Sequence, residues 1–199
     1  MRHIGLTGNI AIGKSAVAEL CREWGATIID ADQLVREAQA AGEPLLAAMA
    51  ERFGHDVLRP DGSLDRDRMR DIMLRDADAR AGLNALVHPE VQRRRQLALN
   101  AALLRGDPTV ISDIPLLYEV MDPAEFDAVV LVDAPEAVRF DRLVRLRGLE
   151  PGEAKALIDA QLPSSVKRAR ADYVIENAGT RDDLRQAARE VWTSLLQRA

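Results

Sequence analysis

The sequence predicts an α/β fold built on a parallel β-sheet, and three observations support this prediction. Five short apolar segments have the length and composition of buried strands, and helix-like segments lie between them. The first strand candidate leads into a glycine-containing turn that opens a helix. Residues 42–106 instead show one helix-like segment after another with no convincing strand. We therefore expect one α/β unit that carries an inserted helical lobe.

The composition is typical of a globular, helix-rich protein. The chain has 199 residues, of which 47% are hydrophobic and 30% are charged, and its formal net charge is −5. This balance indicates neither a nucleic-acid partner nor an anionic membrane. No leader is visible, and no apolar run approaches the ~20 residues that a membrane span needs. The lone Cys21 lies on the apolar face of the first helix, so we expect a buried thiol, which suits a reducing cytoplasm. Separately, we expect a monomer or weak homo-oligomer.

The turn after the first strand matches the P-loop, a phosphate-binding pattern. Gly8 is followed by four residues and then by Gly13, Lys14 and Ser15. In this pattern the backbone N–H groups surround phosphate oxygens, the lysine reaches the β- and γ-phosphates, and the hydroxyl reaches Mg²⁺. The alternative is an ordinary glycine-rich turn, but the strand before it and the helix after it favour a phosphate site. The predicted ATP-binding residues of the loop are Gly8, Asn9, Ile10, Ala11, Ile12, Gly13, Lys14, Ser15 and Ala16.

Acidic residues follow the second and third strand candidates. Asp30 and Asp32 come at the end of the segment 26–30, and Asp113 ends the segment 109–113. Side chains just past the carboxyl ends of parallel strands face the ligand crevice, which places these carboxylates for chemistry. Asp113 stands where a P-loop protein often keeps a carboxylate for Mg²⁺ or its bound water. For one of the first pair, the alternative is a cap on the following helix.

The central helical stretch contains two candidate ligand contacts. His88 is a candidate hydrogen-bond partner for a ligand, although a local cap or packing role is the alternative. Pro89 is typical of a first helical turn, so we expect a helix to begin there. The arginines at 93–95 form either a solvated face or a contact for a phosphate-bearing substrate.

The last third of the chain supplies two more strands and a basic segment between them. Residues 126–133 are almost continuously apolar, as a parallel strand buried on both faces requires, and residues 172–177 form the fifth candidate. Between them, two helix-like segments are separated by a break at Gly148 and Pro151. Their basic residues suit a lid that closes over a triphosphate, and a salt-bridged surface pair is the alternative. These basic residues are Arg139, Arg142, Arg145, Arg147 and Lys155.

A set of further stretches extends the pattern beyond the P-loop. In order along the chain they are Gly5-Leu6-Thr7-Gly8 to Lys14-Ser15, Ile29-Asp30-Ala31-Asp32 with Arg36, Leu64-Asp65-Arg66, His88-Pro89, Asp113-Ile114-Pro115-Leu116-Leu117, Ala160-Gln161 and Ala171-Asp172-Tyr173 with Asn177. Many kinases share the P-loop alone, whereas this combination is specific. Over nearly its whole length the chain resembles the dephospho-coenzyme A kinase family.

The resemblance implies an activity and an architecture. The activity is transfer of the ATP γ-phosphoryl group to the ribose 3′-hydroxyl of dephospho-CoA, with ATP and dephospho-CoA as partners and Mg²⁺ as cofactor. The architecture is that of a P-loop kinase, a three-layer α/β/α core with a five-stranded parallel sheet, a helical substrate lobe and a helical lid. The expected boundaries are 1–33, 107–138 and 168–199 for the nucleotide-binding core, 34–106 for the CoA-binding lobe and 139–167 for the lid.

The resemblance also implies roles for individual residues. Asp32 is the base or the carboxylate that orients the hydroxyl, and Lys14 is the second catalytic residue. Ser15 and Asp113 are the expected metal ligands. The expected substrate-binding residues are Asp32, Arg36, His88, Asp113 and Leu116. Outside the P-loop, the expected ATP-binding residues are Arg142, Arg145, Arg147 and Asn177.

The chain departs from the family pattern in the lid. Leu146 stands two residues before Gly148, where the family has an arginine, and Leu157 stands where it often has another. Which lid arginine meets the phosphates therefore stays open. Two other functions also stay open, a P-loop kinase for a nucleoside or nucleoside monophosphate and a catalytically weakened ATP-binding homologue. A nucleic-acid role is the weakest alternative, because the chain lacks a broad basic surface.

Overall fold

The computed structural model describes residues 1–197, and the chain forms two compact units. The first unit comprises Met1–Ile29 and Ala102–Ala199, and the second comprises Asp30–Ala101. Each unit is described below by itself. Within the described residues, no helix combines the length and the apolar character that crossing a membrane requires.

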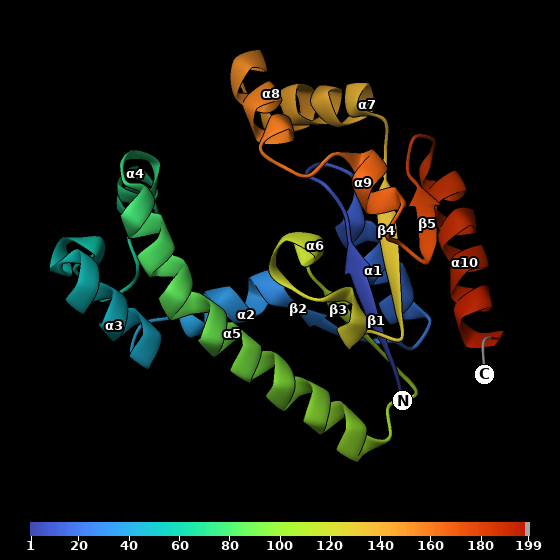
Figure 1. Ribbon diagram of the computed structural model, residues 1–199, viewed down its shortest axis with the longest axis horizontal. Helices are drawn as coiled ribbons and strands as arrows, with labels where there is room; N and C mark the ends of the chain where they lie inside the picture. Colours follow the sequence, from blue (N-terminus) through green and yellow to red (C-terminus); the bar gives the residue numbers. More distant parts are fainter. Residues whose placement is uncertain (198–199) are drawn as a thin grey trace. The chain divides into compact units, whose positions relative to one another are not determined.

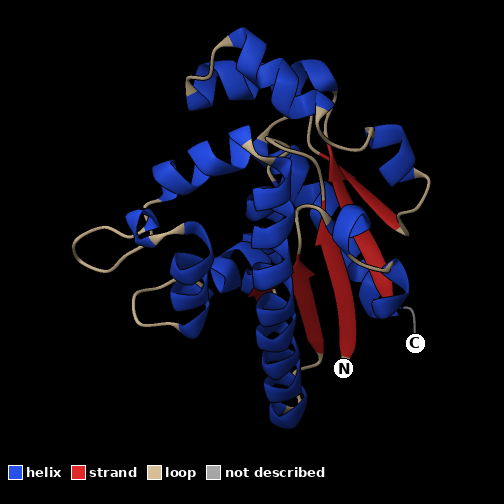
Figure 2. Ribbon diagram, turned by 60° about the vertical axis from the view of Figure 1, so that its left-hand side comes forward, coloured by secondary structure: helices blue, strands red, loops and turns tan. Residues whose placement is uncertain are grey.

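A five-stranded sheet organises the first unit, in the order β2-β3-β1-β4-β5 (Figure 1). β1 pairs in parallel with β3 on one side and with β4 on the other, and β4 pairs in parallel with β5. The strand arrows accordingly point the same way (Figure 2). The five predicted strands and the parallel sheet are therefore confirmed. Their bounds are β1 Arg2–Thr7, β2 Thr27–Asp30, β3 Thr109–Asp113, β4 Ala128–Asp133 and β5 Tyr173–Glu176.

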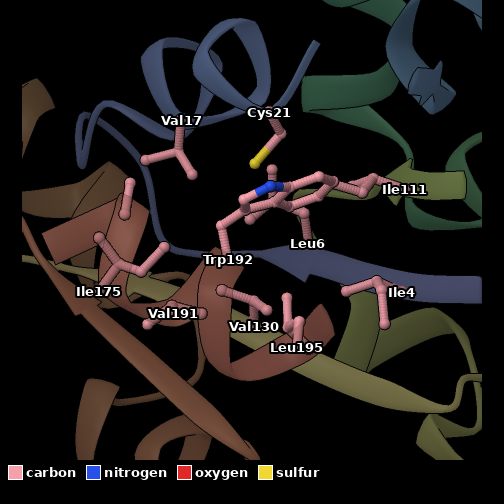
Figure 3. Close-up of a pocket in the computed structure, with 11 residues that line it drawn as sticks. Ile4, Leu6, Val17, Cys21, Ile111, Val130, Ile175, Val191, Trp192 and Leu195 are labelled. Atoms are coloured by element: carbon pink, nitrogen blue, oxygen red, sulfur yellow. The ribbon is translucent and has the colours of Figure 1, made fainter. Parts of the chain in front are cut away.

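Two helices cover one face of the sheet, α1 (Lys14–Glu23) and α10 (Arg181–Gln197). Alternate β1 residues such as Ile4 and Leu6 point into this layer, where they pack with Trp192 of α10. Among these side chains lies a cavity of about 10 Å³, which the sulfur of Cys21 faces (Figure 3). The cavity is at the lower size limit for one water molecule, and its lining is apolar. It is a packing void in the apolar core.

The opposite face of the sheet carries the chain that follows β3. Gly5 of β1 faces this side, and a Cβ at that position would lie 2.7 Å from a methyl carbon of Leu117. Thr7 donates a side-chain hydrogen bond to the carbonyl of Pro115 at 3.1 Å. The short helix α6 (Leu117–Val120) and a 3₁₀ turn, η2 (Pro123–Glu125), belong to this layer. Helices on both faces of the sheet give the three-layer arrangement that the sequence predicts.

Between β4 and β5 the chain forms four short helical segments. They are α7 (Glu136–Asp141), the π-helical turn η3 (Arg142–Leu146), α8 (Pro151–Asp159) and α9 (Ser164–Arg168). Leu143, Ala154 and Ile158 form a small apolar cluster of their own. α9 is anchored by Lys167, which is completely buried with its Nζ atom 2.8 Å from Glu119 Oε1.

The second unit is helical and has its own core. Buried residues of this core include Met49 and Val57, both 0% exposed. Its longest helix runs through Pro89, so the expected helix start at that proline is wrong. Favourable helical sequence on both sides outweighs the loss of one backbone hydrogen bond at the proline. The elements are α2 (Ala31–Ala38), α3 (Pro44–Phe53), η1 (His55–Val57), α4 (Arg66–Arg75) and α5 (Ala77–Arg105), which continues into the first unit.

Candidate active site

The backbone of the P-loop takes conformations that few side chains permit. Gly13 has a φ of 81°, and a Cβ there would collide with the side-chain nitrogen of Asn177. A Cβ on Gly8 would lie 2.5 Å from the carbonyl oxygen of Val132. Ala11 also has a positive φ, of 60°, which is uncommon for a residue other than glycine. Close approach thus requires glycine at both positions, and at Gly13 the left-handed backbone conformation requires it as well.

The first turn of α1 follows the loop directly and is open to a ligand. No side chain caps this helix, and its N-cap residue is Gly13. The first backbone N–H groups of a helix have no partner inside the helix, and the helix dipole places partial positive charge there. Ser15 and Ala16 lie exposed at this turn. The geometry is that of an anion site for phosphate groups.

Asn177 and Arg142 hold the outer side of the loop. The side-chain amide of Asn177, only 6% exposed, donates to the carbonyl of Ile12 at 2.6 Å. Arg142 donates to the carbonyl of Ala11 at 3.2 Å and to the backbone carbonyl of Asn177 at 2.9 Å. Both residues therefore bind loop carbonyls. Because the C=O and N–H of one peptide unit point in opposite directions, these bonds also fix the direction of the N–H groups in the same peptide units.

A short segment after α8, residues 161–164, which ends at the first residue of α9, contacts the first half of the loop. Its first residue, Gln161, accepts a hydrogen bond through Oε1 from the backbone N–H of Ile10 at 2.7 Å. The amide of Asn9 donates to the carbonyl of Leu162 and to Ser164 Oγ, both at 3.2 Å. Ser164 in turn donates to Asp133, at the carboxyl end of β4, at 2.9 Å. We call residues 161–164 the strap.

The apolar residues of the loop pack against the segment between β4 and β5 that contains the predicted lid. Ile10 and Ala11 contact the cluster formed by Leu143, Ala154 and Ile158. Ile12 is 1% exposed and belongs to the main core under the sheet. This packing explains why the interior of the loop carries large side chains where many P-loops carry glycine.

Lys14 forms a nearly buried ion pair with Asp113. The two side chains are 13% and 7% exposed. Asp113 ends β3 and stands opposite Leu6 of β1, so adjacent strands bring the two charged groups together. Ser15, the next residue of α1, supplies a hydroxyl on the exposed first turn. A lysine, a carboxylate and a hydroxyl therefore surround the start of α1.

The lid arginines have different environments. Arg145 is paired with Asp141 at 2.6 Å, with its side chain 78% exposed, and Arg147 is exposed as well. Leu146 between them is 79% exposed, which is unusual for a leucine. Arg139 is buried, at 4% exposure. The structure thus places Arg142 on the loop, and Arg145 and Arg147 at the surface.

The acidic residues after β2 separate into two roles. Asp30 caps α2, since its Oδ1 accepts a hydrogen bond from the backbone N–H of Gln33 at 3.0 Å. This is the helix-cap alternative that the sequence offered for one of the two aspartates. Arg36 lies 3.9 Å from the same carboxylate. Asp32 is exposed in the first turn of α2. Its carboxylate is the one that remains accessible to a substrate.

Two other predicted contacts of the second unit lie on α5. His88 is exposed on this helix. Arg93 and Arg94 both bind Glu90, at 2.7 Å and 2.6 Å, and these hydrogen bonds lower the pKa of Glu90 to about 2. Arg94 also pairs with Glu43, while Arg95 is only 6% exposed and donates to Gln92, so the triplet as a whole is not a solvated face.

Leu116 is a predicted substrate contact, whereas most residues of the strap had no predicted role. Leu116 lies at the start of α6 and is 40% exposed. Ser164 and Asp133 carry no pattern that predicts a role, and Gln161 stood out only as part of the Ala160-Gln161 motif. Ser164 follows Pro163 at a helix start, a position that signals a cap but not a contact with a loop 155 residues away.

Comparison with known proteins identifies the family. A sequence model of the dephospho-CoA kinase family matches residues 2–183. A dephospho-CoA kinase of Streptomyces avermitilis is 46% identical over 100% of this chain and 96% of its own. One from Anaeromyxobacter dehalogenans is 50% identical over 92% of this chain and 87% of its own.

A solved structure agrees with the sequence relatives. A protein from Thermus thermophilus superimposes with a TM-score of 0.80 and 35% identity, over 98% of this chain and 97% of its own. The match extends over the sheet, the P-loop and the helical segments together. The chain therefore belongs to the dephospho-CoA kinase family.

Proposed function

We propose that this protein transfers the γ-phosphoryl group of ATP to the ribose 3′-hydroxyl of dephospho-CoA, giving CoA and ADP. The observation that carries the proposal is the braced P-loop beside the Lys14–Asp113 pair, in a chain of this family. Phosphoryl transfer depends mainly on positioning and charge neutralisation, and a fixed loop with an adjacent cation supplies both.

The proposed nucleotide site uses the loop and the first turn of α1. The backbone N–H groups there hold phosphate oxygens, and Lys14 neutralises the β- and γ-phosphates. When nucleotide binds, the ammonium group of Lys14 exchanges the carboxylate of Asp113 for phosphate. Arg145 and Arg147 of the lid, residues 139–167, then meet the triphosphate.

The residues at this site fit Mg²⁺. A P-loop kinase holds this ion with a hydroxyl, one or two carboxylates and the substrate phosphates rather than with a full protein cage. Ser15 and Asp113 offer such a donor set. Mg²⁺ held there would neutralise charge that develops on the phosphoryl oxygens.

The proposed acceptor site lies on the second unit, within the lobe of residues 34–106 and the turn before it. Asp32 accepts or orients the proton of the 3′-hydroxyl, because its carboxylate is exposed while that of Asp30 is used as a helix cap. Arg36 and His88 bind the anionic parts of dephospho-CoA. The buried, reduced thiol of Cys21 fits the proposed cytoplasmic location.

An acceptor-dependent ADP-release assay tests the proposal. We expect Mg·ATP and dephospho-CoA to support turnover, and CMP, AMP and adenosine to support none. Lys14→Ala and Asp32→Asn should each lose ~10²-fold or more of kcat while they remain folded. Arg181→Ala and Asp67→Asn are matched controls, because they alter an exposed cation at the start of α10 and an exposed first-turn aspartate, and both should keep full activity.

The same assay defines the results that would overturn the proposal. Turnover with a nucleoside or nucleoside monophosphate but not with dephospho-CoA would assign the chain to another acceptor. ATP binding without turnover on any acceptor would show a nucleotide-binding protein that has lost catalysis. Full activity of Asp32→Asn would remove that carboxylate from the reaction.

A further inference from the structure

Gln161 of the strap has one end of its carboxamide fixed on the P-loop. The backbone N–H of Ile10 donates to its side chain at 2.7 Å. Because an N–H group requires an acceptor, the atom that faces Ile10 is the oxygen Oε1. The orientation of the carboxamide is therefore set by chemistry, and its –NH₂ group points away from the Ile10 amide.

The –NH₂ group is a pair of donors that no protein group uses. In the described part of the chain, residues 1–197, no acceptor takes a hydrogen bond from Gln161 Nε2. Gln161 is partly exposed, so these donors remain accessible to a ligand. The same carboxamide is hydrogen-bonded through its oxygen to Ile10 of the proposed phosphate-binding loop.

The backbone on both sides of Gln161 is held in place. Its own N–H donates to the carbonyl of Ile158 at 3.3 Å, and the next residue, Leu162, accepts from Asn9 of the loop at 3.2 Å. Ile158 also belongs to the apolar cluster against which Ile10 packs. Because these contacts fix the backbone, the –NH₂ group needs little reorganisation when a negatively charged phosphate binds beside it. Such preorganisation makes electrostatic stabilisation effective.

We propose that Gln161 is a phosphate-binding residue whose Nε2 donates to the terminal phosphoryl group of the nucleotide, which rests on the proposed function. The amides at the end of the loop and the start of α1 hold the inner phosphates. Ile10 lies three residues before Gly13, toward the strap, so the carboxamide covers the other end of the triphosphate. Gln161 thus joins the lid segment to the group that is transferred.

Two substitutions separate this role from simple support of the loop. Gln161→Glu keeps an oxygen that accepts from Ile10 but has no donor for phosphate, whereas Gln161→Ala loses both functions. By calorimetry with Mg²⁺, we expect both variants to bind a non-hydrolysable ATP analogue ~10-fold or more weakly, the usual effect of one lost charge-assisted hydrogen bond. ADP affinity should change less than about twofold for Gln161→Glu.

The opposite pattern would overturn the proposal. If Gln161 only supports the loop, Gln161→Ala weakens both nucleotides equally, and the side-chain ¹⁵N signal of Gln161 in the wild-type protein responds to the ATP analogue and to ADP alike. Ala156→Glu is the matched control for added negative charge, since Ala156 is exposed on α8, and it should bind both nucleotides normally. If the variants fail to fold, the side-chain ¹⁵N signal of Gln161 in the wild-type protein decides, because it should shift with the ATP analogue and not with ADP.

The outcome is independent of the acceptor. Selective loss of ATP-analogue binding in the variants supports the role of Gln161 even if dephospho-CoA fails to stimulate the wild-type enzyme. Normal turnover of the wild-type enzyme with unchanged ATP-analogue binding in Gln161→Glu would leave the proposed function intact and refute the role of Gln161.

Discussion

Replacing Asn177 by alanine tests whether the P-loop is held from outside. The substitution removes the 2.6 Å hydrogen bond to the carbonyl of Ile12 in a site where Asn177 is 6% exposed. The carbonyl is then left without this partner, and an unsatisfied buried polar group costs about 1–3 kcal/mol. For a chain of this size 1 kcal/mol corresponds to about 2–4 °C in Tm, so we expect a fall of ~4–8 °C for a loss near 2 kcal/mol.

The assay combines chemical denaturation with nucleotide binding. We expect Asn177→Ala to lower the free energy of unfolding by about 2 kcal/mol. We also expect it to weaken ATP and ADP binding together, because the whole loop becomes less ordered. Asn100→Ala is the matched control, since Asn100 is exposed on α5 and its side chain, within residues 1–197, bonds only with Gln96. Its unfolding free energy should stay within about 0.5 kcal/mol of wild type. Wild-type stability of Asn177→Ala would refute the idea that this amide holds the loop.

Three further predictions concern the core and the loop. Burial raises the pKa of the Cys21 thiol from 9.0 to about 12. As the pH rises, the thiol therefore loses its proton in the unfolded chain before it does so in the folded protein. Between pH 9 and 12 the free energy of unfolding should fall by about 1.4 kcal/mol per pH unit. Denaturation at several pH values checks this slope, and a Cys21→Ala variant with the same slope would contradict it. Tyr118 has a buried hydroxyl that finds no hydrogen-bond partner within residues 1–197, so Tyr118→Phe should leave the unfolding free energy unchanged or raise it by up to ~1 kcal/mol, and a clear loss would reveal a partner. Gly13→Ala should abolish ATP binding in a titration, because its Cβ meets Asn177 at a φ of 81°, and retained affinity would show that the loop can rearrange.

The features that the sequence predicted well are set by local pattern. The segment 128–133 is apolar at every position but its last, and all six of its residues are buried in β4. The P-loop spacing likewise depends on adjacent residues, so its position between β1 and α1 followed directly. Pro89 is the counterexample, because a helix with favourable contacts on both sides of a proline overrides the local preference.

The contacts that hold the loop could not be predicted because they join distant parts of the chain. Gln161 and Ile10 are 151 positions apart, and Asn177 and Ile12 are 165 positions apart. Neither glutamine nor asparagine carries a periodic signal that would place it against a particular loop. The basic residues of the lid were visible as a group, but only the three-dimensional structure separates Arg142, on the loop, from the exposed Arg145 and Arg147.

The loop's low glycine content and its external contacts have a common explanation. A residue such as Ala11 in the left-handed region costs of order 1 kcal/mol, and such a conformation persists only where the surroundings hold it. Here the side chain of Ala11 packs against the lid cluster, and Arg142 binds its carbonyl. A loop stabilised in this way keeps its N–H groups directed toward the phosphate site without a ligand. Binding then spends less free energy on ordering the loop, and the geometry for phosphoryl transfer exists before ATP arrives.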